Sequence, residues 1–456
     1  MRGFDEHRAA ATALVTVLPT VEVPLLDALG LVLAADVTTG EALPRWDNSA
    51  MDGYAVRAAD VADGLLPAQL HVVGEVAAGS ADEPAVQPGT AVRIMTGAPV
   101  PPGADAVVPV ELTRPVRSES TGDESTGDES TDDESTDDER SEDGGTEGAV
   151  RTPGSSGGSA GAGWADVGSV VEVRRPVVVG QHVRRAGEDA TAGDVVLTAG
   201  AVVGPAHVAA AASVGRATLF VHRRPRIAVV STGDELVPPG DPLRRGQIPD
   251  SNSWLLAAAV RDAGADALRI GPVDDDPAGL HRLLVALDAG EHGQIDGIVT
   301  SGGVSAGAFD VVKAALADEP GVEFVPVAVQ PGKPQGLGRL ARGTPVWTLP
   351  GNPVSSFASF EVFVRPALRR LLGDADGDRP RVRAVADEGW RTPAGRTQLM
   401  PVRRVGNDEP VRVRPATARG SGSHLVARLA LAQGLAVVPA DVDEVRVGDT
   451  LEVFWT

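Results

Sequence analysis

A glycine turn between an apolar run and a helix-like segment carries the strongest chemical signal in this 456-residue chain. The apolar run 295–300 leads into SGGVSAGAFD at 301–310, and helical spacing follows. Glycines let the backbone approach a ligand, and the free N–H groups at a helix start point toward negative charge. The turn is therefore predicted to bind an anion. The residues predicted to do so are Ser301, Gly302, Gly303 and Ser305.

Asp310 ends this turn, and a carboxylate is out of place in a site for a bare anion. It fits better if a metal cation lies between the carboxylate and a phosphate or oxyanion. Three further polar turns follow apolar runs: STGDE at 231–235, DDDP at 274–277 and PGNP at 350–353. Singly, each could be a polar loop or a helix cap, and Asp276 is well placed to cap the next helix. Together at one sheet edge, they predict Mg²⁺ held by one or two carboxylates and by phosphate oxygens.

Two other features favour a negatively charged ligand. Asn352 suits the N-cap of a helix and Pro353 its first position, so the exposed N–H groups there form a second anion site. The helix dipole alone is worth about 0.3–1 kcal/mol at such a site. Lys333 lies between two prolines in the segment PGKP. The prolines stiffen this segment, so its ammonium group suits a phosphate or oxyanion, although a lone surface lysine is more often only solvated.

These turns need a framework, and the sequence from Pro225 to about Leu372 predicts one. Apolar runs alternate there with segments of helical spacing, which is typical of a parallel, doubly wound sheet with helices on both faces. Ligands of such sheets bind beyond the carboxyl ends of the strands, where the four turns lie. The expected strands are 226–231, 268–273, 295–300, 322–329 and 345–349. The expected helices are 252–263, 277–288, 309–317 and 353–372.

The flanking regions have other patterns. Residues 5–18, 24–35 and 205–214 have helical spacing, whereas short strands and turns fill most of 47–110 and predict a small β-rich unit. From Arg381 onward, alternating segments are separated by glycine turns. This last pattern predicts a small β-barrel or sandwich.

Residues 115–165 are predicted to be a disordered insertion. The repeat STGDE, with its variant STDDE, fills 120–139, and a Gly/Ser-rich run follows it. A segment with so few apolar side chains cannot offset the entropy lost on ordering. Strands at 105–110 and 169–173 are expected to pair, so the insertion would enlarge a hairpin loop. We interpret it as a solvated tether, and a regulatory or docking tail is the alternative.

Charge and composition exclude several classes of function. The net charge is −22, and residues 115–165, with 14 acidic and 3 basic residues, hold half of that excess. The remainder has no basic stripe, so no nucleic-acid partner is expected. The lack of cysteine excludes disulfides, thiolate nucleophiles and iron–sulfur clusters. No apolar run has the length of a signal peptide or a membrane span, so a cytoplasmic protein without a membrane partner is expected.

Seven segments occur in the order of one known family. They are DNSAMDGYAV, RIMTGAPVP, RRAGED, STGDEL, SGGVSAGAFD, PGKP and LPGNPVS. With these segments the chain resembles the molybdopterin molybdenumtransferase family, which includes the MoeA proteins and the E domain of gephyrin. The resemblance covers nearly the whole chain except 115–165, and seven motifs in order are far more specific than any one of them.

The resemblance implies a multidomain fold of the α/β plus β class, and a homodimer. Its site would form between the α/β domain of one subunit and the β-rich domain of the other. The α/β domain would resemble the adenylyltransferase of the same pathway. The implied parts are an elongated linker region (1–43 and 191–222), a β-rich domain with the insertion (44–190), the α/β domain (223–373) and a C-terminal β-barrel (374–456).

The resemblance also implies a transferase of molybdenum cofactor biosynthesis. The substrates would be molybdate and adenylylated molybdopterin, and the cofactor Mg²⁺ or another divalent metal. Molybdenum would enter the dithiolene and AMP would be released. The molybdopterin adenylyltransferase and acceptor molybdoenzymes are implied partners. Two alternatives stay open, namely an adenylyltransferase-like nucleotide enzyme on the same α/β unit and a catalytically weakened scaffold of this fold.

Roles carry over to this chain motif by motif. Pro350 and Pro353 would shape the neighbourhood of molybdate, and Ser423 in GSGSH would contribute from the barrel. The implied catalytic residues are Asp52, Thr96, Asp189 and Glu235. The implied metal ligands are Glu235, Asp275 and Asp310. The implied ligand-binding residues are Arg184, Ser301, Gly302, Gly303, Ser305, Lys333, Pro350, Pro353 and Ser423. The chain departs from the family at Pro326 and Gln330, where lysines are frequent, and at Ala186 in the basic run.

Overall fold

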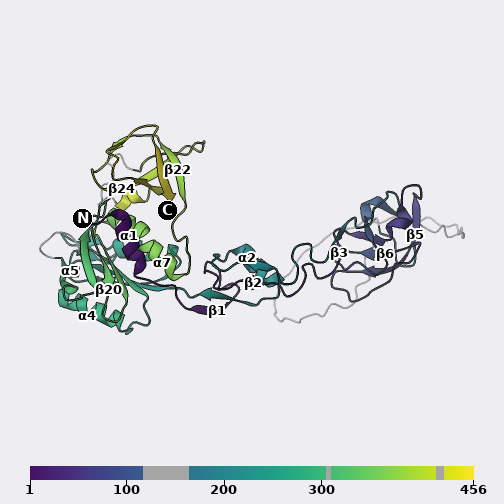
Figure 1. Cartoon of the computed structure of the whole chain (residues 1–456), viewed down its shortest axis with the longest axis horizontal. Coiled ribbons are helices and arrows are strands. Elements are labelled where there is room, and N and C mark those ends of the chain that lie inside the picture. Colours follow the sequence, from purple (N-terminus) through teal and green to yellow (C-terminus); the bar gives the residue numbers. More distant parts are fainter. Residues whose placement is uncertain (117–163, 304–309, 417–425) are drawn as a thin grey trace, which may run out of the picture. The chain divides into compact units, whose positions relative to one another are not determined.

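The computed structural model describes four stretches of the chain: 1–116, 164–303, 310–416 and 426–456. These residues form two compact units, one of Thr39–Asp194 and the other of Met1–Thr38 with Val195–Thr456 (Figure 1). The larger unit holds the α/β domain, the C-terminal barrel and the linker strands. The smaller unit is the β-rich domain. The predicted fold class is therefore confirmed.

The centre of the α/β sheet consists of strands that are buried on both faces. β13 (Arg226–Thr232), β17 (Gly297–Ser301) and β21 (Pro345–Leu349) pair in parallel, and most of their residues are buried. Continuous apolar runs suit this position because helices cover both faces of parallel strands. The sheet order is β16–β13–β17–β21–β20–β18. The outer strands are β16 (Asp266–Val273), β20 (Pro334–Arg339) and β18 (Val322–Pro326).

One strand of this sheet was not predicted. β20 runs antiparallel to both β21 and β18, so the sheet is parallel at β16, β13, β17 and β21 and mixed at its other edge. β20 contains two glycines, Gly336 and Gly338, which weaken the sequence signal for a strand. An ideal Cβ at Gly338 would lie 2.0 Å from the Gly321 carbonyl oxygen, so close backbone packing excludes a β-branched residue there. The expected strand 322–329 also divides, and its second part, β19 (Val329–Gln330), pairs with a barrel strand.

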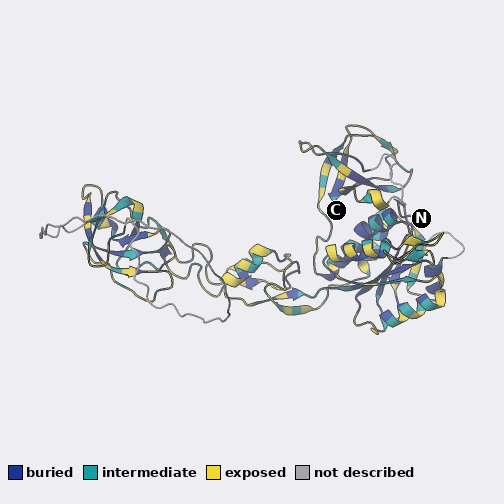
Figure 2. Cartoon of the chain, turned by 180° about the vertical axis from the view of Figure 1, so that it is seen from behind, coloured by how far each residue is buried: buried dark blue, intermediate teal, exposed yellow. Residues whose placement is uncertain are grey.

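Helices cover both faces of the sheet (Figure 2). One buried cluster joins Val229, Val299 and Trp347 to the helices on one face, and a second joins Ala228 and Ile298 to those on the other. The predicted doubly wound arrangement is thus confirmed. On the first face lie α3 (Asn252–Asp262), α6 (Pro353–Ser359), the π-helix η3 (Phe360–Val364) and α7 (Arg365–Leu371). On the second lie α4 (Pro277–Asp288) and α5 (Val311–Ala315).

The first helix belongs to the α/β domain and not to the linker region. α1 (Phe4–Ala13) packs His7 edge-on against Phe363, with ring centroids 4.7 Å apart. The Trp347 indole N–H donates to the Ala11 carbonyl over 3.3 Å. The assignment of residues 1–43 to the linker is therefore wrong at its N-terminal end, because the apolar face of α1 is buried against the α/β core.

The linker strands form their own small core. β1 (Thr20–Pro24) pairs with β12 (Thr218–His222), and β2 (Val37–Thr38) pairs with β11 (Val195–Leu197). α2 (Pro205–Ser213) confirms the predicted helix at 205–214. The helix predicted at 24–35 is wrong. Gly30 has φ +78°, which breaks a helix, and the apolar residues after it form bridges to strands instead.

The β-rich unit contains a six-stranded sheet in the order β7–β4–β6–β5–β9–β8. β8 pairs with β9, so the predicted pairing of 105–110 with 169–173 is wrong, because β7 pairs with β4. Its strands are β4 (Gly53–Val56), β5 (Ala68–Val76), β6 (Thr90–Ile94), β7 (Ala106–Pro109), β8 (Thr113–Val116) and β9 (Val170–Val173). β3 (Asn48–Ser49) and β10 (Val183–Arg184) form a separate antiparallel pair. Two 3₁₀ turns accompany them, η1 (Ala58–Val61) and η2 (Val110–Leu112).

The ends of the predicted insertion are structured. Pro115 and Val116 lie in β8, Ala165 is 1% exposed, and the Trp164 ring lies 5.5 Å from that of Tyr54. The Ala165 N–H donates to the Tyr54 hydroxyl oxygen over 2.7 Å. The predicted limits of 115–165 are therefore too wide at both ends. Residues 117–163, on which the prediction of disorder falls, lie outside the described part of the chain.

The C-terminal domain is a barrel of five strands. β24 pairs with β25 and β26, and β22 and β28 complete the closed order β24–β25–β22–β28–β26. This confirms the barrel over the sandwich. Its strands are β22 (Arg381–Ala386), β24 (Thr397–Val405), β25 (Arg412–Pro415), β26 (Gly434–Val438) and β28 (Thr450–Trp455). Shorter elements are β23 (Trp390–Arg391), β27 (Glu444–Val445) and α8 (Val426–Leu429).

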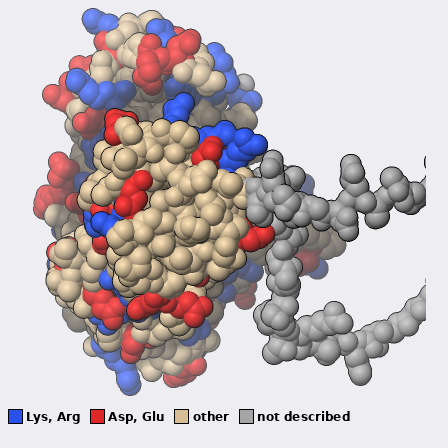
Figure 3. Space-filling view, turned by 90° about the vertical axis from the view of Figure 1, so that its right-hand side faces the viewer, with Lys and Arg blue, Asp and Glu red and all other residues tan. Residues whose placement is uncertain are grey.

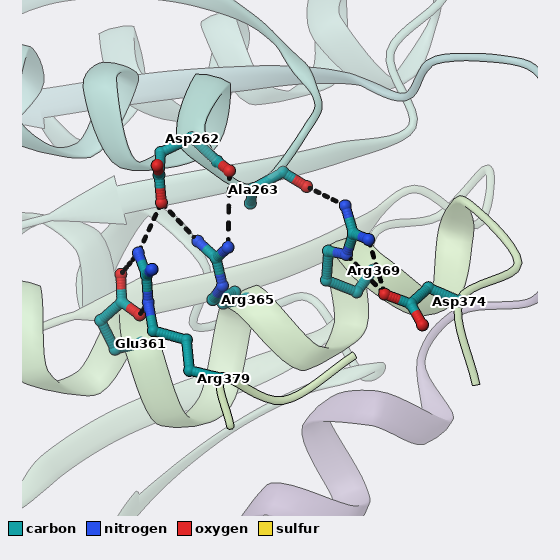
Figure 4. A network of polar contacts seen from close by, with 7 residues as sticks. All are labelled: Asp262, Ala263, Glu361, Arg365, Arg369, Asp374 and Arg379. Atoms are coloured by element: carbon teal, nitrogen blue, oxygen red, sulfur yellow. Dashed lines mark hydrogen bonds and ion pairs between the residues drawn. The ribbon is translucent and has the colours of Figure 1, made fainter. Parts of the chain in front are cut away.

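An ion-pair network fixes the segment that leads from α7 into the barrel (Figure 4). Arg379 Nε lies 2.6 Å from a carboxylate oxygen of Glu361, whose side chain is 1% exposed. Arg369 pairs with Asp374 at 2.6 Å. Asp262 of α3 contacts both Arg379 and Arg365. The network joins this segment to α3 and to the helix that begins at the PGNP turn.

The buried His7 predicts a pH dependence of stability. Burial, and secondarily the charge of Arg2, lowers the pKa of His7 to about 4. The unfolded chain binds a proton near the ordinary pKa of 6.5 and the folded chain does not, so the free energy of unfolding falls between pH 6.5 and 4. The full loss is about 3 kcal/mol. His7→Gln should flatten this slope in denaturant titrations at several pH values, whereas His292→Gln, at an exposed site, should not. An unchanged slope for His7→Gln would contradict this assignment.

Candidate active site

A cavity of about 880 Å³ lies at the carboxyl edge of the α/β sheet. The turns that follow β13, β17 and β21 all line it, as predicted for a sheet of this kind. Two short parallel strands, β14 (Leu236–Val237) and β15 (Ile248–Pro249), contribute to its wall. The predicted site residues in its lining are Glu235, Asp275, Ser301, Gly302, Gly303, Asp310, Pro350 and Pro353. Ser305 and Ser423 lie outside the described residues.

The glycine turn has the backbone geometry for which glycine is required. Gly302 has φ +105° and Gly303 φ +61°. An ideal Cβ on Gly303 would lie 2.7 Å from the backbone nitrogen of Val312, near the start of α5. The glycine therefore lets the turn approach the beginning of the helix closely. The Gly302 N–H donates to the Leu349 carbonyl over 3.2 Å, which ties the turn to the end of β21.

The PGNP turn leads into α6. Pro353 is the first helical residue, as predicted, and Asn352 precedes it in an extended conformation. Asn352 occupies the N-cap position, as predicted, but its side chain makes no capping hydrogen bond. The first-turn N–H groups of α6 consequently lack a cap from this residue, and they lie at the cavity edge.

Acidic side chains line the same cavity as these turns. Burial raises the pKa of Asp275, and the negative charges of Asp234, Glu235 and Asp274 raise it further. The Asp275 N–H donates to Asp234 Oδ1 over 2.8 Å, which fixes the loop after β16 to the loop after β13. A carboxylate whose pKa is raised by like charges gains from a nearby cation.

The metal-ligand prediction is tested only in part by this geometry. Glu235, Asp275 and Asp310 line one cavity. However, the described residues contain no group of three or more acidic or histidine side chains close enough to hold an ion. Asp310 lies 3.4 Å from Lys313 Nζ. The donor set fits Mg²⁺ in its usual mode, in which one or two carboxylates, substrate phosphates and water complete the coordination.

Two sequence predictions about single residues have different outcomes. Asp276 caps α4 by accepting from the Ala278 N–H over 3.0 Å, as predicted. Lys333 is exposed and does not line the cavity, although its neighbours Pro331 and Gly332 do. Its backbone carbonyl accepts from the Val327 N–H. Its contact with an oxyanion stays a prediction.

Sequence reasoning missed three residues of the cavity. Asp250, Ser251 and Asn252 line it at the start of α3. Asp250 is fully buried and accepts from the Ser231 hydroxyl over 2.7 Å. The sequence PDSNS at 249–253 offered one signal, a run of residues typical of a helix N-terminus that also contains a carboxylate.

The other predicted catalytic residues lie in the β-rich unit. The Thr96 N–H and hydroxyl donate to Asp52 Oδ1 over 2.6 Å and 2.8 Å. These two hydrogen bonds, the backbone one first, lower the pKa of Asp52. Arg184 is exposed on β10 opposite Asn48, and Asp189 is exposed in the following turn. The structure thus joins Asp52 to Thr96 in one unit, whereas the cavity lies in the other.

Surface charge and helix length bear on two other predictions, the lack of a nucleic-acid partner and the lack of a membrane partner. In the space-filling view of Figure 3, acidic and basic side chains are interspersed, so neither sign dominates the described residues that are visible there. Within the described stretches, no helix combines the length and the apolar character that crossing a bilayer requires. The cytoplasmic location and the lack of a nucleic-acid partner stay predictions.

The fold and the cavity define an α/β protein whose candidate ligand site lies beyond the carboxyl ends of its strands. Comparison with known proteins narrows this class. Three family models match: "MoeA N-terminal region (domain I and II)" over 2–215, "Probable molybdopterin binding domain" over 228–370 and "MoeA C-terminal region (domain IV)" over 383–454. The chain therefore belongs to the MoeA family of molybdopterin molybdenumtransferases, which are transferases of molybdenum cofactor biosynthesis.

Relatives and solved structures agree with this assignment. Molybdopterin molybdenumtransferase 2 of Mycobacterium tuberculosis is 42% identical over 467 aligned positions, which cover 100% of this chain and 99% of the relative. Molybdopterin molybdenumtransferase of Haemophilus influenzae is 30% identical, with 94% and 92% covered. A solved structure of the molybdopterin biosynthesis MoeA protein from Pyrococcus horikosii is 27% identical with a TM-score of 0.73, covering 99% of this chain and 98% of that one.

The glycine turn predicts a difference between two alanine substitutions. Gly303 and Gly395 have similar φ values of +61° and +66°, but only at Gly303 would a Cβ meet another atom within 4 Å. Gly395→Ala should cost about 1 kcal/mol from backbone conformation alone. Gly303→Ala should cost more and should also weaken binding of AMP, because the turn must move away from α5. Thermal unfolding and calorimetry measure the two effects, and equal behaviour of the two variants would contradict the required close approach.

Proposed function

We propose that this protein inserts molybdenum from molybdate into the dithiolene of adenylylated molybdopterin and releases AMP. The observation that carries the proposal is the convergence of two anion-binding turns and several carboxylates on one cavity. The glycine turn and the first turn of α6 offer N–H groups to phosphate and oxyanion oxygens. The acidic side chains in the same cavity suit a substrate that arrives with a divalent cation.

The carboxylates have separable roles in this proposal. Glu235 and Asp275 would hold Mg²⁺ or another divalent ion, and Asp310 would face it from the end of the glycine turn. When bound, such an ion neutralises phosphate charge and polarises the anhydride bond. The raised pKa of Asp275 supports this assignment, since its cause is the crowding of negative charge that a cation relieves.

The β-rich unit would complete the site from a second copy of the chain. Asp52 is fixed by Thr96, and Arg184 and Asp189 are exposed in the same compact unit. We propose a homodimer in which these residues face the cavity of the partner subunit. The division of the predicted catalytic residues between two compact units supports the idea that one unit alone lacks the full set.

Two other functions fit the chain less well. An adenylyltransferase-like enzyme would need the α/β domain alone, and the family match over all regions of the chain favours the full transferase. A scaffold without catalysis would have no use for the acidic group around Asp275, whose mutual repulsion destabilises the ionised form. The molybdopterin adenylyltransferase and acceptor molybdoenzymes are proposed as partners because they would supply the substrate and receive the product.

Glu235→Gln should reduce metal-dependent release of AMP by about a hundredfold or more, because it removes a charged group from the reacting centre. The assay follows AMP from adenylylated molybdopterin with molybdate and Mg²⁺. Glu388→Gln, an exposed acid-to-amide change in the barrel, is the matched control and should keep full activity. Undiminished AMP release by Glu235→Gln would remove this residue from the mechanism.

The proposed dimer predicts complementation between inactive variants. Asp52→Ala and Glu235→Gln each remove one half of a shared site, so a mixed dimer should hold one intact site of its two if the halves come from different subunits. A 1:1 mixture after subunit exchange, in which about half of the dimers are mixed, should then recover about a quarter of the wild-type sites. Light scattering should report twice the chain mass of 46.7 kDa. A monomer that is fully active would contradict the shared site.

A further inference from the structure

One side chain contacts both anion-binding turns of the cavity and has no role in the proposal above. Asn252 is the first residue of α3 and lines the cavity. Its Nδ2 lies 2.8 Å from Ser301 Oγ, at the glycine turn, and 2.5 Å from the Gly351 carbonyl oxygen, in the PGNP turn. These turns follow different strands, β17 and β21. Asn252 is therefore a direct connection between them.

The directions of these hydrogen bonds follow from the number of protons. The Gly351 carbonyl can only accept, so the amide nitrogen of Asn252 must face it. The Ser356 hydroxyl donates to the Pro350 carbonyl. Because a hydroxyl has one proton, Ser301 must be the donor in its 3.2 Å contact with Ser356. Ser301 then accepts from Asn252. Asn252 thus reaches the PGNP turn in two ways, directly at the Gly351 carbonyl and through Ser301 and Ser356 at the Pro350 carbonyl.

The two turns also meet through their backbones. An ideal Cβ on Gly351 would lie 3.4 Å from the Cα of Gly302, so no side chain separates them. Besides the pairing of β17 with β21, which aligns Ser301 with Leu349, the turns are connected by the hydrogen bonds at Ser301 and by the backbone bond from the Gly302 N–H to the Leu349 carbonyl. Removal of Asn252 takes away the two side-chain bonds that hold the turns from the α3 side.

Asn252 is itself held in a fixed place. The carboxylate of the buried Asp250 accepts from the Ser231 hydroxyl at 2.7 Å, the Ser253 hydroxyl at 2.5 Å and the Ser253 N–H at 3.1 Å. Ser231 lies at the end of β13, so the start of α3 is joined to the central strand of the sheet. The position of Asn252 is therefore fixed by the sheet, independently of the two turns that it contacts.

We propose that Asn252 is a positioning residue that sets the distance between the glycine turn and the PGNP turn. The inference rests on the proposed function, in which a phosphate contacts the first turn and a second anionic group contacts the other. A ligand that spans both turns binds well only to molecules in which both are already in place. Its apparent Kd equals the intrinsic Kd divided by the fraction of molecules in that arrangement, so a smaller fraction means weaker binding.

The test compares Asn252→Ala and Asn252→Asp with wild type and with Asn407→Ala, an exposed barrel residue outside the cavity. KM and kcat of AMP release from adenylylated molybdopterin, and the Kd of AMP, are measured. Asn252→Ala should raise KM about tenfold with kcat within about threefold, because saturating substrate restores the arrangement. Asn252→Asp keeps the size but loses both donors and adds a negative charge, so its KM should rise at least as much.

Hydrogen exchange at residues 301–303 and at residues 351 and 352 provides a readout without substrate. Both turns should exchange faster in Asn252→Ala, and Asn252→Ser, which keeps one donor, should lie between. A fall in kcat with unchanged KM would indicate a loss of folded protein and would overturn the positioning role, as would unchanged exchange in either turn. If wild-type protein neither binds AMP nor releases it, the proposed function fails and this inference fails with it. If wild type does both and the variants match it, only the inference fails.

Discussion

The parallel register of β13, β17 and β21 is the constraint on which the site depends. Ser231 is paired with Ser301, and Ser301 with Leu349, so the three strands end at the same level. Each following loop therefore starts beside its neighbours. The glycine turn and the PGNP turn then come close at Gly302 and Gly351, where an ideal Cβ on Gly351 would lie 3.4 Å from the Gly302 Cα. A shift of one residue in this register would separate the groups that form the cavity.

Several carboxylates lie close together at that edge of the sheet. The loop after β16 brings Asp275 beside the loop after β13, and burial together with neighbouring carboxylates raises its pKa. Such crowding destabilises an empty site and favours a ligand that carries a cation between the carboxylates and its phosphates. The helix that starts at the PGNP turn ends in the network of Glu361, Arg365 and Arg369, which fixes the segment leading to the barrel. The site and the domain junction thus share one rigid element.

Much of this architecture could be predicted from local patterns. The central strands and α3, α4 and the long helix from Pro353 have apolar runs or periodicity that the final packing keeps. β20 could not be found because its glycines serve close backbone contact and carry no strand signal. α1 has the same amphipathic pattern whether it packs on the linker or on the α/β domain, so only tertiary contacts decide.

In the site, too, some residues could be predicted from local sequence and others depend on tertiary contacts. Glycine turns, Asp275 and Pro353 lie in motifs whose local geometry is encoded nearby. Asn252 was missed because its partners are 49 and 99 residues away in sequence, and only the sheet register brings them together. The side chain of Asn352 has the type preferred at an N-cap but makes no such bond. Residue type therefore indicates which hydrogen bonds a side chain can make, whereas the fold decides which of them it makes.

The central claim is that the carboxylates at this sheet edge hold a cation that bridges them to a phosphate of the ligand. The most direct measurement is a crystal structure of the protein with AMP and Mn²⁺, in which anomalous scattering locates the metal. The claim predicts an anomalous peak within coordination distance of Glu235 or Asp275 and of the AMP phosphate, with that phosphate at the glycine turn. AMP bound in this cavity without a metal peak, or bound away from it, would contradict the claim.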